Sequence, residues 1–298
     1  MAQQSLLYKF YIRALFVIAS GLSILIYLFV YHILRYRYNI VIDNLTKSFP
    51  GKTQPQLKIY ARDYYRHLGD LMVEPLLFML VNHETRQRLA HYTNIELLGQ
   101  LYERGNNLVA LAAHCGNWEY YINFPKIQPF KTYTAYTPLS SKWLDQYILK
   151  LRSMYGVILF PKRNFFRGAL SVLKTNDNPS MVVVIADQRP APGSAKNFVE
   201  FLGQPTQVQI GAERLATASG AAVVYIECIK KSRFHYDYTF HIISDDASGC
   251  LPTEITNTYY RMLENNIMKS PPYWLWSHNR WKPLEGDRQP NAALLSNA

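Results

Sequence analysis

The stretch Leu108-Val-Ala-Leu-Ala-Ala-His114-Cys115-Gly116-Asn117-Trp118-Glu119 joins an apolar run to a histidine and, five residues later, a carboxylate. An uninterrupted apolar run of this kind is typical of a strand buried on both faces. Gly116 permits the backbone angles of a tight turn, and Asn117 is a suitable N-cap for a helix starting at Trp118. The sequence therefore predicts a strand, a turn and a helix. His114 then lies at the carboxyl end of the strand, where open α/β sheets bind ligands.

The residues of this turn can support general-base chemistry. Residues five apart on a continuous helix are rotated by roughly 140°, so His114 and Glu119 meet only because the chain turns between them. In the first helical turn Glu119 stays ionised and can accept a hydrogen bond from one imidazole nitrogen, which leaves the other to take a proton. Backbone amides near Asn117 and Trp118 are candidates to stabilise an oxyanion. The competing interpretation is that His114 is a satisfied structural residue at a strand end.

The rest of the chain alternates strands and helices from about residue 92. The expected strands are 92–96, 108–113, 131–137, 157–161, 181–186, 221–228 and 234–243. The expected helices are 97–104, 118–124, 140–155, 166–175, 208–219 and 254–269. This alternation predicts an α/β fold with a mixed, largely parallel sheet flanked by helices.

An N-terminal membrane anchor is expected over residues 1–38. Residues 14–34 carry no charge other than that of His32 when protonated, which suits a transmembrane helix of about 20 residues. A signal peptide is the alternative, but no small-residue cleavage site follows, and tyrosines gather at the far end as in an interfacial belt. The excess of Lys and Arg after the helix places the main domain, 39–283, in the cytoplasm. Residues 284–298 are expected to form a flexible tail.

A second long helix is expected over residues 54–80, where apolar and aromatic residues recur at helical spacing. His67, Asp70 and Glu74 share one face of it. We expect this polar face to be solvated and not to form a second site. A zinc-protease pair is excluded here, since the histidine after His83-Glu84 is His91, too far along for HExxH.

Charge and cysteine usage limit the partners and the compartment. The formal net charge of +11 favours an anionic partner, namely a phospholipid surface, an acidic carrier protein or nucleic acid. Nothing resembles a zinc finger or an RNA-binding motif, so we do not expect nucleic acid. Three widely spaced cysteines, Cys115, Cys228 and Cys250, imply no disulfide framework and fit a reducing compartment.

A family resemblance sharpens this picture. His114-Cys-Gly-Asn-Trp-Glu119 resembles the His-x4-Asp/Glu motif of lysophospholipid and glycerolipid acyltransferases. It is closer to the H-x-G-N-W-E form of the bacterial lipid A biosynthesis lauroyl/myristoyl acyltransferases. Further blocks of that family occur in order, and together they span Asn39 to Lys282. They are Asn44-Leu-x3-Phe-Pro50, Gly156 to Arg163, Asp187-Gln188, Val199-x-Phe-x-Gly-x-Pro205 and Trp276-x-His-x-Arg-Trp-Lys282.

The resemblance implies an acyl donor on a thioester, carried by acyl carrier protein or coenzyme A, and a membrane-lipid acceptor, with no metal or redox cofactor. The acceptor is expected to be a lipid A precursor or a related glycolipid or aminolipid at the cytoplasmic face of the bacterial inner membrane. The glycerolipid enzymes carry F-P-E-G-T-R where this chain has the 199–205 block, which argues against a glycerol-phosphate acceptor. The residues expected to act are His114 and Glu119 in catalysis, Gly116 and Trp118 in the turn and oxyanion site, and Asn117, Lys162, Arg163, Asp187, Gln188 and Glu200 in substrate binding. Arg163 is preferred over Lys162 for phosphate, because guanidinium binds phosphate bidentately.

Some alternatives remain open from the sequence. Asp187 and Gln188 can also simply tie down a turn. His278 is a second histidine of interest, in a tryptophan-rich segment that is either interfacial or closes the core. A thioesterase or cysteine hydrolase would use Cys115, and a non-catalytic membrane adaptor would use the basic surface alone.

Overall fold

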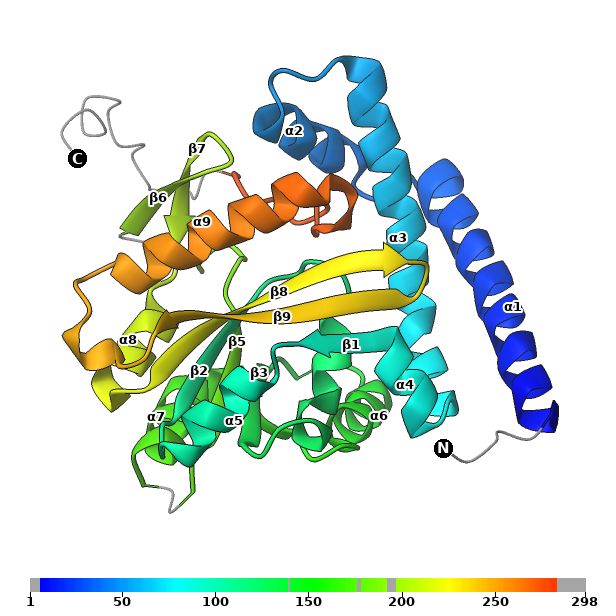
Figure 1. Cartoon of the computed structure of the whole chain (residues 1–298). Coiled ribbons are helices and arrows are strands. Elements are labelled where there is room, and N and C mark those ends of the chain that lie inside the picture. The colour runs from blue at the N-terminus through cyan, green and yellow to red at the C-terminus, as the bar shows by residue number, and fades with distance from the viewer. Residues whose placement is uncertain (1–5, 139, 176–177, 192–196, 283–298) are drawn as a thin grey trace.

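The computed structural model of the chain describes residues 6–138, 140–175, 178–191 and 197–282. A seven-stranded sheet with the order β1-β9-β8-β2-β5-β3-β4 forms its centre (Figure 1). All neighbouring strands are parallel except β8 and β9, so the sheet is mixed and largely parallel, as predicted. The strands are β1 (Ala90–Thr93), β2 (Leu108–Ala112), β3 (Lys131–Tyr136), β4 (Ile158–Pro161), β5 (Ser180–Ile185), β8 (Ala222–Ser232) and β9 (His235–Ser244).

Two further strands form a separate antiparallel hairpin. They are β6 (Asn197–Phe201) and β7 (Gln204–Val208). The sequence did not predict these strands, because the Val199-x-Phe-x-Gly-x-Pro205 block was interpreted only as a motif. Phe201 packs its ring against Tyr260 and Trp274, so the hairpin covers the carboxyl-terminal part of the fold.

Helices cover both faces of the sheet (Figure 1). The α-helices are α1 (Leu6–Leu28), α2 (Tyr38–Ser48), α3 (Gln54–Leu80), α4 (His83–Leu89), α5 (Glu96–Glu103), α6 (Lys142–Ser153), α7 (Phe165–Thr175), α8 (Gly211–Ser219) and α9 (Glu254–Lys269). A 3₁₀-helix, η2 (Trp118–Lys126), follows β2, and three shorter 3₁₀ turns are η3 (Lys162–Asn164), η4 (Ala247–Gly249) and η5 (Pro271–Tyr273). The helix predicted over 54–80 has these bounds in the structure.

The central strand β2 contributes to two hydrophobic cores. Val109 and Leu111 face a core shared with α7, α8 and α9, whereas Leu108, Ala110 and Ala112 face a core shared with α5 and η2. This follows from the two-residue repeat of a strand, which sends alternate side chains to opposite faces. A strand with both faces covered must be apolar throughout, which accounts for the run that ends at His114.

Helix α1 continues through a π-helical turn, η1 (Phe29–Ile33), and lies along α3 (Figure 1). Residues 6–33 are long and apolar enough to cross a membrane, and most of their side chains face away from the rest of the protein. The uncharged run predicted over 14–34 lies within this helical stretch, except for its last residue. The expected tail, 284–298, lies outside the described residues.

The tryptophan-rich segment after α9 closes the core and is not an interfacial surface. Trp274 and Trp276 are buried with their rings 4.8 Å apart. The Asn44 amide of α2 donates to the carbonyls of Trp276 and His278, at 2.8 Å each. The Asn44-Leu-x3-Phe-Pro50 block therefore fixes the carboxyl-terminal segment, since Phe49 also packs its ring against Trp276.

Replacing Trp276 by alanine is expected to lower the free energy of unfolding by about 3–5 kcal/mol, since it empties a fully buried site and removes an indole hydrogen bond to the Pro271 carbonyl. Urea denaturation in detergent measures this. Trp143→Ala is the matched control: its side chain is 75% exposed, and we expect a change below about 0.5 kcal/mol. Equal losses in the two variants would contradict the assigned role of the segment.

Candidate functional site

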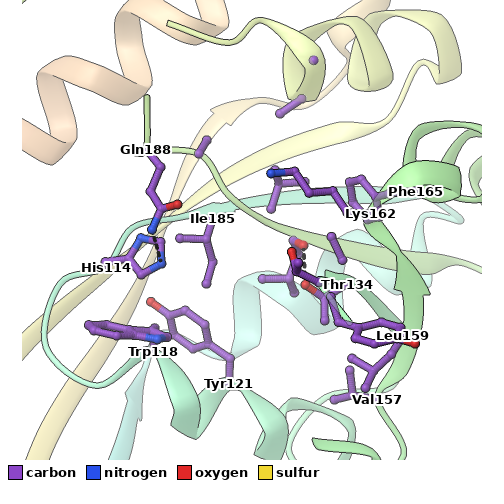
Figure 2. A pocket seen from close by; sticks show the side chains of 18 of the residues that line it. His114, Trp118, Tyr121, Thr134, Val157, Leu159, Lys162, Phe165, Ile185 and Gln188 are labelled. Carbon is purple, nitrogen blue, oxygen red and sulfur yellow. Dashed lines mark hydrogen bonds between the residues drawn. The ribbon is translucent and has the colours of Figure 1, made fainter. Parts of the chain in front are cut away.

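A pocket of about 630 Å³ opens at the carboxyl ends of β2, β3, β4 and β5. Figure 2 shows His114, Trp118 and Tyr121 on one side of it and Val157, Leu159, Lys162 and Phe165 on the other. Apolar side chains form much of the wall, and Thr134, Gln188 and a few charged side chains add polar groups. The pocket therefore has room and walls for an apolar chain beside a reactive histidine.

His114 is held by a carboxylate on the neighbouring strand end. Its Nδ1 lies 2.7 Å from Oδ1 of Asp187, and its backbone N–H donates to Oδ2 at 3.0 Å. The Trp274 indole also donates to Oδ2, at 2.8 Å. Because an ionised carboxylate only accepts hydrogen bonds, Nδ1 carries the proton and Nε2 is left as the basic nitrogen.

Asp187 is ionised despite being only 2% exposed. Burial alone would raise the pKa of this carboxyl, but the adjacent His114 ring and the hydrogen bonds from His114 and Trp274 outweigh it and lower the pKa to about 2. The ring of His114 therefore faces a fixed negative charge at any physiological pH.

The second ring nitrogen of His114 faces the pocket (Figure 2). The Gln188 amide nitrogen lies 3.2 Å from Nε2. The indole of Trp118 packs edge-on against the imidazole, with ring centroids 4.9 Å apart. Nε2 is thus the nitrogen that a substrate hydroxyl or amine would reach. The substrate group would displace the Gln188 amide from it.

The predicted hydrogen bond between Glu119 and the His114 ring is wrong, since Asp187 takes that position. Both oxygens of Glu119 instead accept from Arg152 of α6, at 3.2 and 2.7 Å. The reason is local: the Trp118 ring occupies the space beside the imidazole, and η2 directs Glu119 along the pocket wall. Nothing in the sequence pointed to Arg152.

The turn between β2 and η2 has the predicted form. Gly116 has φ +56°, and an added Cβ would lie 2.3 Å from the Cys228 sulfur, so only glycine fits. Asn117 caps η2, accepting from the Glu119 backbone N–H at 2.9 Å. The side chain of Asn117 is fully buried and points into the protein, so it is not a substrate-binding group.

The polar face of α3 is also not what the sequence predicted. His67, Asp70 and Glu74 are buried, and His67 and Glu74 contact Gly116 and Asn117 of the turn. Glu74 accepts from the Asn117 amide and from the Tyr236 hydroxyl, each at 2.6 Å. Burial raises the pKa of Glu74 to about 7.

The remaining predicted substrate-binding residues divide into two groups. Among the described residues that line the pocket, Lys162 and Gln188 are present, whereas Arg163 and Glu200 are not. The lining also includes Arg189 and Arg152, which the sequence did not suggest as site residues. Arg163 follows Lys162 in the turn η3, so the preference for it over Lys162 is not supported by its position.

His278 and Cys115 have structural positions. His278 accepts a hydrogen bond from the Arg189 backbone N–H at 3.1 Å, and burial lowers the pKa of its imidazole to about 4. It therefore fixes the loop after Asp187. Cys115 is buried, and burial raises the pKa of its thiol well above the usual value, so it is a poor nucleophile.

Comparison with known proteins identifies the family of the chain. The model of the bacterial lipid A biosynthesis acyltransferase family matches residues 13–283. The chain belongs to this family. His114, Asp187 and the described residues that line the pocket all lie within the matched region.

Two curated relatives are similar over part of the chain. They are phosphatidylinositol mannoside acyltransferases of Mycobacterium tuberculosis, from strains ATCC 25618 / H37Rv and CDC 1551 / Oshkosh. Each is 25% identical over 178 residues, which cover 59% of this chain. The match spans 55% of the length of each relative.

The buried carboxyl of Glu74 predicts a pH-dependent stability. Its pKa is about 7 in the folded protein and about 4.3 in an unfolded chain, so the folded state holds the proton more tightly. The corresponding stability is complete below about pH 4 and is lost as the pH rises through 7. We expect Glu74→Gln to remove this decline, and thermal unfolding at pH 5, 6, 7 and 8 measures the difference. If the unfolding temperatures of wild type and Glu74→Gln depended on pH in the same way, the raised pKa of buried Glu74 would be contradicted.

Proposed function

We propose that the chain transfers a fatty acyl group from a thioester, on acyl carrier protein or coenzyme A, to a hydroxyl or amine of a membrane glycolipid. The observation that carries the proposal is the imidazole of His114, whose Nδ1 is held by buried Asp187 while Nε2 faces a pocket with apolar walls. This is the base and orienting carboxylate of a catalytic triad, with the nucleophile supplied by the substrate.

The reaction follows from that arrangement. Nε2 of His114 takes the proton of the acceptor hydroxyl or amine as its oxygen or nitrogen attacks the thioester carbonyl carbon. Asp187 stabilises the imidazolium that results, without itself taking the proton. The tetrahedral intermediate collapses, the C–S bond breaks and the imidazolium protonates the leaving thiolate. We propose that backbone N–H groups at the start of η2, near Trp118, stabilise the oxyanion.

The pocket supports both an acyl chain and an anionic group. Val157, Leu159 and Phe165 offer an apolar wall for the chain (Figure 2). Lys162 and Arg189 line the same pocket, so we propose that they bind phosphate of the donor or the acceptor. We propose that Glu119 acts through its ion pair with Arg152. This pair stabilises the pocket wall next to His114.

The acceptor is proposed to be a lipid A precursor or a related glycolipid. The family name points to lipid A, and the names of the two mycobacterial relatives point to another glycolipid. The basic residues after α1 favour a catalytic domain at the cytoplasmic face of the bacterial inner membrane. Mass spectrometry of intact membrane lipids, with and without the protein, identifies the acceptor.

Exchange of the base or its orienting carboxylate tests the reaction. We expect His114→Ala and Asp187→Asn each to lower kcat by roughly 10²–10⁴-fold, since the first removes the base and the second the charge that fixes its tautomer. Release of free thiol from the donor, with membrane lipid present, is the measurement. Glu119→Gln is expected to cost less, because its partner is Arg152 and not the base.

Two outcomes separate the rival functions. Full turnover in both His114→Ala and Asp187→Asn would refute the mechanism. No turnover in the wild-type protein, with His114→Ala still active in a complementation test, would indicate a non-catalytic adaptor. Loss of turnover in Cys115→Ser, with His114→Ala active, would indicate a cysteine hydrolase.

Lys162 and Arg163 make a matched pair for substrate binding. Lys162→Met is expected to raise KM for the phosphate-bearing substrate by about 10-fold or more, because a hydrogen bond from a charged group is lost. Arg163→Met removes the same charge from the neighbouring residue, which is not among the described pocket-lining residues, and is expected to change KM less than about twofold. Steady-state kinetics at constant ionic strength measures both. The reverse order would restore the role first predicted for Arg163.

A further inference from the structure

Four buried titratable side chains lie beneath the catalytic turn and take no part in the proposed chemistry. They are His67, Asp70 and Glu74 of α3 and Lys230 of β8. His67 is 2% exposed, and the side chain of Lys230 is 6% exposed. Buried charges of this kind are weak evidence for stability, because a well-packed apolar cluster is often at least as stable. Their connections suggest a role in placing the turn.

His67 links the turn to Lys230. The Lys230 ammonium lies 3.2 Å from Nδ1, and the Gly116 carbonyl lies 3.2 Å from Nε2. Since an ammonium group only donates, Nδ1 accepts and Nε2–H donates to the carbonyl. Burial and the charge of Lys230 lower the pKa of His67 well below its usual value, so the ring stays neutral. One tautomer therefore holds the Gly116 carbonyl.

Asp70 continues this connection to α1. Its Oδ2 accepts from Lys230 at 2.7 Å, and its Oδ1 accepts from the Ser23 hydroxyl at 2.6 Å. Arg233 also donates to Oδ1, at 3.0 Å, and to the Ser20 carbonyl of α1 at 3.0 Å. The polar path thus runs from the apolar N-terminal helix to the catalytic turn.

The contact between α1 and α3 is close at the point where this path begins. A Cβ at Gly69 would lie 2.6 Å from the Ser23 carbonyl oxygen, so glycine is required for the two helices to approach. Ser23 is 1% exposed. The hydroxyl of Ser23 is therefore fixed against Asp70 only while α1 is docked on α3.

We propose that Ser23, Asp70, Lys230 and His67 form a positioning relay through which the docked helix α1 holds the Gly116 turn. This turn positions the Trp118 ring against the His114 imidazole and directs Glu119 to Arg152. The relay rests on the proposed acyl transfer, because that is the reaction the turn serves. Its members are not among the described residues that line the pocket beside His114; they line a second pocket, of about 640 Å³, next to α1. As a consequence, the rate of acyl transfer depends on the position of α1 against α3. Turnover is thereby coupled to the membrane that α1 is proposed to enter.

The test at the turn uses full-length protein in phospholipid nanodiscs. His67→Met keeps the bulk and removes both ring nitrogens, and we expect kcat to fall about 10- to 100-fold with KM changed less than about twofold. His67→Gln offers an amide N–H to the Gly116 carbonyl and an oxygen to Lys230, and is expected to restore most of kcat. A merely space-filling role would give the opposite order.

The test at the membrane helix uses two serines of α1. Ser23→Ala cuts the relay and is expected to lower kcat about 2- to 10-fold, the equivalent of one hydrogen bond. Ser20→Ala is the matched control, because Ser20 contributes only its backbone carbonyl to Arg233 and we expect wild-type kcat.

A spectroscopic readout follows the turn without turnover. In protein carrying 5-fluorotryptophan, the Trp118 resonance is identified by its absence in Trp118→Phe. We expect this resonance to shift in His67→Met and in Ser23→Ala, and to return toward its wild-type position in His67→Gln.

The outcomes separate the relay from the proposed function. Wild-type protein that transfers no acyl group overturns the function, and the fluorine spectra still decide the relay. Normal transfer with wild-type kcat and an unmoved Trp118 resonance in His67→Met and Ser23→Ala overturns the relay. If His67→Met does not fold, the Ser23→Ala and Ser20→Ala pair decides, and equal behaviour of the two overturns the relay.

Discussion

The buried carboxylate of Asp187 is the interaction on which the site depends. Within the described part of the chain, the carboxylate accepts three hydrogen bonds. Two come from the imidazole and the backbone N–H of His114, and the third comes from the Trp274 indole. A buried charge is stable only with such partners. The bonds therefore join three segments, the ends of β2 and β5 and the carboxyl-terminal segment, into one structure. Helix α9 supports both strand ends, because two adjacent tyrosine hydroxyls bond the carbonyls of Ala112 and Ala186.

Much of the fold follows from local pattern. The apolar runs predicted the strands of the central sheet to within a few residues, and helical spacing predicted α3 and α9 with their observed bounds. The β6–β7 hairpin was missed because each strand has only five residues, and neither Asn197–Phe201 nor Gln204–Val208 has a clear alternation of apolar and polar residues. The polar face of α3 was predicted to be solvated, since spacing shows which residues share a face but not what that face packs against.

The candidate site shows the same limit. The residues 114–119 predicted the turn and the position of His114 at the strand end, because glycine and an N-cap leave a local signal. The partner of the base was assigned to Glu119, the nearest carboxylate in sequence, whereas Asp187 holds it. That contact depends on β5 lying beside β2, and strand order is a property of the whole sheet. Arg152 was beyond prediction for the same reason, because it reaches the pocket from α6.

The two carboxylates near His114 lie in different surroundings, and we propose different roles for them. Asp187 follows a central strand and is surrounded by donors, so its charge is fixed and it can orient and stabilise an imidazolium. Glu119 lies on a 3₁₀-helix at the pocket wall, with its side chain 21% exposed and paired with a cation. A base held by a sheet keeps its geometry whatever occupies the pocket, while the wall around Glu119 can vary with the ligand. We therefore expect the 114–119 turn and Asp187 to determine the chemistry, and the wall of the pocket to determine the acceptor.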